Sequence, residues 1–582
     1  MNLKHINQEI FNNQIKEQVK EQDLNITFDL ASQPILWINT NIIPDLLKKF
    51  DLHFNYLTDL TCYDNVDKAD GNKRFILVYQ LYSLENDIRL RIKLPVDEGE
   101  VVPSLSSIYL SANWLEREVF DLYGITFSSH PDLRRIMMDE RFIGHPLRKE
   151  YPLKQRMQFA DNIKINLDRS PTDPNKNDKN ANKENDPLLN LYNPEILLNL
   201  GPSHPAMHGT LRVMCRLDGE NIEDLKCELG YLHRGIEKLG ENLTYHQWIV
   251  HTDRLNYCSA LNNNIAYVMT VEKLLSINVP ERSIWIRIIC MEISRIIDHL
   301  VCIAINALDM GAMTIFWHLY HWREVAYTMI EGLCGMRLTT TYARIGGMSY
   351  DTYDGFEEHL QDFCEKLPKA LDEVQNLLSN NRIWIDRTKG VGVLTKEQAL
   401  TLSASGPILR ASGVPFDLRR DFPYYFYPDL KFDVVVGSAG DVYDRYLVRM
   451  EEVKQSILIL KQSLKELKKL KGAPIWTDVP QIAIPDKKDV YSKMEVLIHH
   501  FKIFMEGINV SKGEVYNSVE GPNGELGFYI VSRGGPKAWR MRIKSPSFLH
   551  FQLAEHMLKN EKIPDAIAII GSLNIIAGEM DR

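Results

Sequence analysis

Two histidines four residues apart stand in a segment that cannot form a regular helix, Gly201-Pro202-Ser203-His204-Pro205-Ala206-Met207-His208-Gly209. Pro205 lacks a backbone donor and restricts His204 to extended geometry, so we expect both imidazoles on a turn where they can meet a ligand. Imidazole has the side-chain pKa nearest neutrality, which suits it to donating a proton to a substrate that has just received electrons. The spacing is equally consistent with histidines that only stabilise the turn, because such pairs are common.

An acidic residue, Asp309, follows directly on a long apolar stretch and precedes Met310-Gly311-Ala312-Met313. An unpaired carboxylate in apolar surroundings is costly, so Asp309 should have a partner. A histidine is a natural partner, although a helix cap or an arginine would serve as well. Two more polar clusters, each a weak signal alone, are residues 231–238, with Arg234, and residues 253–257, with Arg254 and Tyr257.

Helices and strands must position these groups. Apolar residues recur with helical period in two long stretches, which predicts two long helices whose stripes serve core packing and not cofactor binding. Strand-like runs occur near 196–200, 211–217 and 528–531. The two helical stripes are Ile286, Ile289, Ile293, Ile296, Leu300 and Ile303, and Leu447, Met450, Val453, Ile457, Leu460, Leu464 and Leu467.

The first part of the chain has a different pattern. Residues 75–82 and 88–94 flank a turn, and the second run alternates apolar with basic residues, which predicts a hairpin with one face buried and the other in water. Pro103-Ser104 looks like a helix start, and a helix is expected over 114–123, ended by Gly124. We therefore expect a small α+β body here.

A polar stretch divides the two parts. Residues 161–187 are almost devoid of large apolar side chains after Leu167, so burial cannot offset the entropy of ordering them. The fold class is α+β, and we predict three parts. These are a small α+β domain at 1–160, a flexible linker at 161–190, and a large, mainly helical domain with peripheral strands at 191–582.

Composition excludes several classes of protein. A net charge of -9 and a pI near 6.1 give no basic footprint for nucleic acid. Eight cysteines form no C-x-x-C pair, so neither a zinc nor an iron–sulfur ligand set is visible and reduced, mostly buried thiols are expected. The start of the chain lacks the apolar core of a secretion signal, and the apolar stretch 284–308 carries too many charges to face lipid. We expect a cytoplasmic protein with at most peripheral membrane association.

Several motifs taken together resemble one family in both parts of the chain. The N-terminal motifs resemble the C-type subunit of the proton-pumping NADH:quinone oxidoreductase, respiratory complex I, and those from Gly201 onward resemble its D-type subunit. The chain thus resembles the fused C/D subunit of some bacteria. The C-type motifs are Glu116-Arg117-Glu118, Asp121-Leu122-Tyr123-Gly124-Ile125, His130-Pro131-Asp132-Leu133-Arg134-Arg135 and His145-Pro146-Leu147-Arg148-Lys149. The D-type motifs are the His204–His208 turn, Leu232-His233-Arg234-Gly235, Asp253-Arg254-Leu255, Tyr257 and the terminal Asp581-Arg582.

The resemblance implies a site for a quinone, ubiquinone or menaquinone. The D-type subunit is similar to the large subunit of nickel–iron hydrogenases, but the metal-binding cysteines are missing here and no metal is expected on this chain. In the family the vacated pocket holds the quinone headgroup, next to a [4Fe-4S] cluster carried by a partner subunit. The resemblance therefore implies that His208 and Tyr257 hydrogen-bond the two quinone oxygens, and that Asp309 is the carboxylate that pairs with the histidine.

Further roles follow from the same resemblance. Arg234 and Arg254 match arginines on the cluster side, where positive charge favours the reduced cluster, and His204 orients the turn. Loss of the His208 proton would leave Asp309 without its counter-charge, a local event that could start proton translocation. Where much of the family has a histidine beside the cluster this chain has Thr339, which cannot titrate near neutrality and gives no reason to expect a pH-dependent cluster potential.

The resemblance also implies partners and a location. The partners are other complex I subunits: the small iron–sulfur (B-type) subunit, the ferredoxin-like subunit and the membrane-arm quinone-channel subunit. The expected location is the cytoplasmic side of the bacterial inner membrane. The polar turns of the C-type part are expected to form a surface on which other subunits dock. Two alternatives remain open here, an assembly scaffold whose pocket is vestigial and a metal-binding hydrogenase relative, the latter disfavoured by the missing cysteines.

Overall fold

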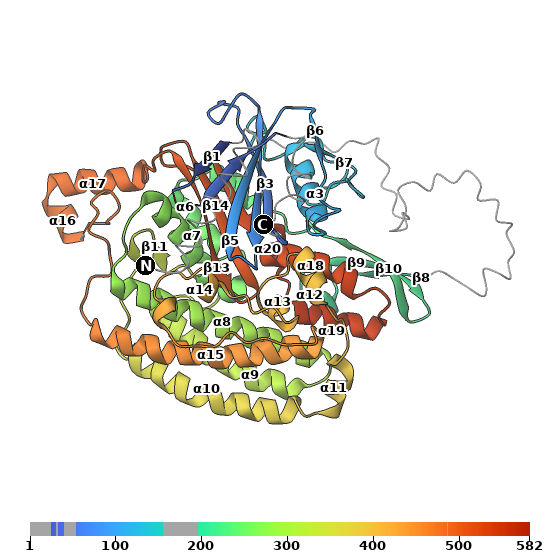
Figure 1. Ribbon diagram of the computed structural model, residues 1–582. Coiled ribbons are helices and arrows are strands. Elements are labelled where there is room, and N and C mark those ends of the chain that lie inside the picture. Colours follow the sequence, from blue (N-terminus) through green and yellow to red (C-terminus); the bar gives the residue numbers. More distant parts are fainter. Residues whose placement is uncertain (1–24, 31–32, 40–53, 155–195, 486) are drawn as a thin grey trace.

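The computed structural model describes residues 25–30, 33–39, 54–154, 196–485 and 487–582 (Figure 1). The predicted linker at 161–190 lies outside these ranges, so the domain boundaries stay a prediction. Within the described ranges, none of the helices has the length and apolar character that crossing a membrane requires.

In the described residues, the N-terminal part contains a five-stranded sheet with helix α3 against it. The strand order is β1-β2-β5-β4-β3, with β2 and β5 parallel and the other pairs antiparallel. Helix α3 ends at Gly124, whose φ of 78° closes it as predicted, but the helix start expected at Pro103-Ser104 is wrong because Pro103 ends strand β6. The bounds are β1 Asn25–Phe28, β2 Pro34–Trp37, β3 Tyr56–Asp64, β4 Phe75–Ser83, β5 Ile88–Val96, β6 Val101–Pro103, α3 Ala112–Tyr123 and β7 Thr126–Ser128.

The predicted hairpin forms from β4 and β5, but its expected solvent face is wrong. Arg91 and Lys93 are 0% and 3% exposed. The basic residues of β5 face the second part of the chain, where Arg91 and Lys93 contact Glu514 at 3.2 and 2.6 Å and Arg89 contacts Glu525 at 2.9 Å. The alternation of apolar and basic residues in β5, which predicts a solvent-exposed face, therefore belongs to an interface. Buried carboxylates neutralise the basic residues there.

The second part combines layered helices with three small sheets. Both long stripes form the predicted helices, α8 and α15, which pack against each other, and α9 and α10 extend the layer below the sheets in Figure 1. The strands predicted near 196–200, 211–217 and 528–531 are confirmed as β8, β9 and β14. The bounds of the strands are β8 Ile196–Leu200, β9 Arg212–Asp218, β10 Asn221–Glu228, β11 Ala343–Arg344, β12 Gly347–Met348, β13 Gly513–Gly521, β14 Gly524–Ser532 and β15 Arg540–Lys544.

The helices follow in chain order. They are α5 Ile236–Asn242, α6 Tyr245–Thr252, α7 Ala260–Leu275, α8 Glu281–Asp309, α9 Met313–Cys334, α10 Phe356–Leu378, α11 Arg382–Thr388, α12 Lys396–Thr401, α13 Gly406–Ala411, α14 Leu418–Asp421, α15 Val442–Lys469, α16 Lys487–Ser492, α17 Met494–Met505, α18 Pro546–Met557, α19 Ile563–Leu573 and α20 Ala577–Asp581. The described ranges also contain the 3-10 turns η2 Pro205–Met207, η3 Tyr257–Ser259 and η4 Tyr427–Asp429. Seven of the eight cysteines are buried and all are free thiols, as predicted.

One apolar core runs through both parts of the chain. Buried ion pairs cross the same boundary: Arg542 contacts Asp59 at 2.7 Å and Glu118 at 2.6 Å, and Arg582 contacts Glu118 at 2.8 Å. Removing one partner of such a pair leaves an uncompensated buried charge. The two parts are therefore held together by contacts that do not need the covalent connection.

Cutting the connection should leave the two parts associated. We expect a chain with a protease site inserted within 161–190 to elute after cleavage as one species in size-exclusion chromatography, even at about 1 M salt, because buried pairs are screened little. A matched chain that also carries Arg542→Glu, which puts like charges against Asp59 and Glu118, should separate. Fragments that elute apart without that substitution would contradict the prediction.

Candidate functional site

The histidine-bearing turn lies between β8 and β9 and rests against helix α19. As predicted, it is no regular helix but a single 3-10 turn, and Met207 is fully buried beneath it. His208 has a φ of 52°, a left-handed conformation that is uncommon for a residue other than glycine. The turn therefore aims the His208 ring in a direction that an ordinary backbone would not give, while His204 stays exposed.

The structure brings His208 and Asp309 together. Nε2 of His208 and Oδ2 of Asp309 form a short hydrogen bond, and each side chain is about one-fifth exposed, at 20% and 21%. Asp309 is the last residue of α8, so an imidazolium there would meet both a carboxylate and the negative end of the helix dipole. The partner expected for Asp309 is thus a histidine, not an arginine.

Gly571 of α19 makes room for the His208 ring. A Cβ added at this glycine would lie 3.3 Å from Cε1 of His208 and 3.0 Å from Oδ1 of Asn306. A larger residue would crowd the His208 ring and the Asn306 side chain. Gly571, which carries no sequence motif of its own, is therefore part of the site.

Tyr257 opens the short turn η3 and is 42% exposed. Desolvation by burial, with smaller contributions from the charges of Cys258 and Asp298, raises the pKa of Tyr257 to about 12. Its phenol is consequently protonated at neutral pH and can donate a hydrogen bond.

Helix α8 supports both groups. Asp298 of this helix lies near Tyr257, and Asp309, which contacts His208, is its last residue. Among the described residues no hydrogen bond joins Tyr257 directly to His208 or Asp309. The histidine and the tyrosine therefore both lie beside helix α8.

The two predicted arginines also meet. Nη2 of Arg234 donates to the carbonyls of Arg254, at 2.9 Å, and of Gly578, at 2.7 Å. Burial lowers the pKa of Arg234, while the Arg254 side chain is 58% exposed beside Asp253. Arg234 thus anchors the segment that leads into η3, and Arg254 leaves its charge at the surface.

Sequence reasoning missed three side chains that support this region, Asn256, Asp298 and Asn574. Their hydrogen bonds link the Tyr257 turn, helix α8 and the end of α19. Asp298 is visible in the sequence only as one of several charged residues in the stretch 284–308, and no spacing pattern connects it with residues 256 and 574.

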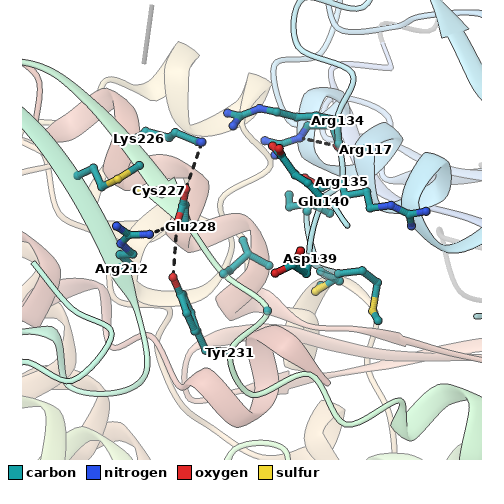
Figure 2. Close-up of a pocket in the computed structure, with 16 residues that line it drawn as sticks. Arg117, Arg134, Arg135, Asp139, Glu140, Arg212, Lys226, Cys227, Glu228 and Tyr231 are labelled. Carbon is teal, nitrogen blue, oxygen red and sulfur yellow. Dashed lines mark hydrogen bonds and ion pairs between the residues drawn. The ribbon is translucent and has the colours of Figure 1, made fainter. Parts of the chain in front are cut away.

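A cavity of about 340 Å³ lies elsewhere, between the N-terminal part and the β9–β10 strands (Figure 2). Its basic residues already have partners: Arg212 and Lys226 contact Glu228 at 2.8 and 3.1 Å, Arg134 contacts Asp132, and Arg135 contacts Asp121. The turn with Arg134 and Arg135 therefore lies across this cavity from β9 and β10 of the second part, and its expected role as docking surface stays a prediction. This cavity contains none of the predicted site residues.

No three metal-ligating side chains of the His, Cys, Asp or Glu type come together within the described ranges.

Two family models match the chain. The model described as "Respiratory-chain NADH dehydrogenase, 49 Kd subunit" matches residues 309–582, and that of the 30 Kd subunit matches residues 36–157.

Individual proteins give the same result over most of the chain. It is 42% identical over 529 residues to the C/D subunit of NADH-quinone oxidoreductase from Bdellovibrio bacteriovorus, covering 91% of both chains. The second C/D subunit of Aquifex aeolicus is 40% identical over 540 residues, which cover 91% of this chain and 92% of that one. The D-type subunit of Geobacter sulfurreducens is 49% identical over 387 residues, which cover 66% of this chain and 98% of that one.

Proposed function

This chain belongs to the family of NADH-quinone oxidoreductase C/D subunits, and we propose that its second part forms the quinone headgroup site of that complex. It is one subunit of respiratory complex I. The His208–Asp309 contact carries the proposal, because it joins residues 101 positions apart into a proton-donating pair at the surface of the fold.

Reduction of a quinone to a quinol requires two proton donors. A quinone that accepts two electrons also takes up two protons, one on each oxygen, to become the quinol. An imidazolium at His208 and the protonated phenol of Tyr257 can hydrogen-bond the two oxygens and supply these protons. Because Tyr257 has a pKa of about 12, it releases its proton only to an oxygen made strongly basic by reduction.

Asp309 couples this chemistry to a change in the protein. When His208 gives up its proton, the attraction between the ring and the Asp309 carboxylate weakens, and Asp309 shifts or finds another partner. We infer that this step links quinone reduction to proton translocation in the rest of the complex.

The remaining features of the proposal follow from the family. The electrons come from a [4Fe-4S] cluster held by the small B-type subunit, with Arg234 and Arg254 on that side and His204 orienting the turn. The ferredoxin-like subunit and the membrane-arm quinone-channel subunit are the other neighbours, and the chain is peripheral on the cytoplasmic side of the bacterial inner membrane. The site corresponds to the pocket that holds the metal in nickel–iron hydrogenases.

Neutralising Asp309 should weaken both reactions. We expect Asp309→Asn to lower quinone reduction by about tenfold or more and proton translocation with it, because the imidazolium of His208 loses the negative charge that stabilises it. The measurement is NADH:quinone activity and proton uptake into vesicles, each normalised to electron transfer to ferricyanide, which needs no quinone. Asp386→Asn, at an exposed aspartate of α11 paired with Arg382, is the matched control. Wild-type levels of both activities in Asp309→Asn would refute this role.

A further inference from the structure

Asp298 is a buried carboxylate held between two side-chain amides. It lies on α8 and is 1% exposed. Nδ2 of Asn256 donates to Oδ2 of Asp298 at 2.8 Å, and Nδ2 of Asn574 donates to Oδ1 at 2.5 Å. Each carboxylate oxygen thus accepts from a different segment of the chain.

The Asn256 amide holds the turn that carries Tyr257. Oδ1 of Asn256 accepts a hydrogen bond from the backbone N–H of Cys258 at 3.0 Å, which caps η3, and the Asn256 carbonyl accepts one from Nδ2 of Asn263 at 2.9 Å. Tyr257 is the residue between the two ends of this cap. The position of its backbone therefore depends on the orientation that Asp298 gives to the Asn256 side chain.

The Asn574 amide holds the end of the helix that contacts His208. Asn574 caps α19 with a φ of 52°, and Gly571, three residues before it, lies against the His208 ring. A shift of this helix end would move Gly571 and, with it, the wall behind the ring. Asp298 is thus connected through one hydrogen bond to each of the two segments that place the proposed proton donors.

We propose that Asp298 is a positioning residue that fixes the Tyr257 turn relative to the end of α19 behind His208, and so sets the geometry of the quinone site. This inference rests on the proposed function of His208 and Tyr257 and adds a residue that touches neither the quinone nor either donor through a hydrogen bond of its own.

The charge of Asp298 fits this role. Burial is the largest influence on Asp298 and raises its pKa, whereas His299, Arg449 and the two amide hydrogen bonds act in the opposite direction. Both amides donate, so the carboxylate accepts both bonds without a proton of its own. Its negative charge also contributes to the raised pKa of Tyr257, although burial is the larger cause.

An exchange of the two side chains tests the proposal. In Asp298→Asn alone, the new amide N–H group faces one of the two amide donors, Asn256 or Asn574, and cannot accept its hydrogen bond. In Asn256→Asp alone, the carboxylates at 256 and 298 repel each other. Combined, Asp298→Asn with Asn256→Asp restores complementarity, because the new carboxylate at 256 can accept from the new amide at 298 and from the Cys258 N–H. Asn574 can still donate to the amide oxygen at 298.

The readout is kcat and KM for a short-chain quinone in the assembled complex, normalised to NADH:ferricyanide activity and to the amount of complex. We expect each single substitution to lower kcat/KM at least about tenfold and the pair to recover to within about threefold of wild type. A pair as impaired as the product of the single effects would overturn the proposal. So would a loss of assembled complex that alone accounts for the lost quinone activity, which is the result of a purely structural role.

The same assays separate this inference from the proposed function. If His208→Ala and Tyr257→Phe abolish quinone reduction while the residue 298 and 256 single substitutions do not affect it, the positioning role fails and the quinone site stands. If His208→Ala and Tyr257→Phe leave quinone reduction intact, the quinone site fails and the positioning role fails with it.

Discussion

Replacing His208 by alanine should lower quinone reduction by at least about 100-fold while the complex still assembles, because a positioned general acid contributes rate factors of this size. The side chain is about one-fifth exposed and lies on a turn between two strands, outside the apolar core. The substitution also removes the partner of Asp309 and leaves that carboxylate to water. NADH:quinone activity, normalised to NADH:ferricyanide activity in the same preparation, measures the effect.

A matched histidine outside the site provides the control. His359 on α10 is exposed and contacts only the Tyr353 hydroxyl among the hydrogen bonds described, so His359→Ala should leave both activities unchanged. Loss of assembled complex in His208→Ala would favour a structural role for the turn. Retained quinone activity with normal assembly would favour the alternative of a scaffold with a vestigial pocket.

The spacing of apolar residues predicted the helices that carry the site better than it predicted the contacts within the site. Helices α8 and α15 follow from apolar residues repeating every three to four positions, because the period that identifies a helix is local in the sequence. The wet face expected for β5 failed for the opposite reason. Lys93 contacts Glu514, 421 positions later in the chain. No local sequence pattern distinguishes a cation exposed to water from one that contacts a carboxylate far away in the sequence.

The candidate residues show the same division. A partner for Asp309 was expected from the cost of burying an unpaired carboxylate, and the structure supplies His208. Asp298 belongs to the same helix, yet in the sequence it served only as one of the charges that exclude a membrane span. Its importance comes from Asn256 and Asn574, 42 and 276 positions away, which only the folded chain brings to it.

Replacing Tyr257 by phenylalanine should lower kcat/KM for the quinone by about 100-fold, since the ring stays and only the proton-donating hydroxyl is lost. Because burial raises the pKa of Tyr257 to about 12, the phenol is protonated throughout the range from about pH 6 to about pH 9. The loss should therefore be of equal size across that range. Activity of the assembled complex against pH, with wild type measured in parallel, tests both parts of the expectation.

The control for this substitution is a tyrosine that lies in water. Tyr491 on α16 is 80% exposed, and Tyr491→Phe should not change quinone activity at any of these pH values. A Tyr257→Phe defect that disappears toward high pH would mean that the hydroxyl titrates within the range and is not the protonated donor proposed here. A defect absent at every pH would leave His208 as the one proton donor of this chain, and the second quinone oxygen would have to take its proton from water or from a partner subunit.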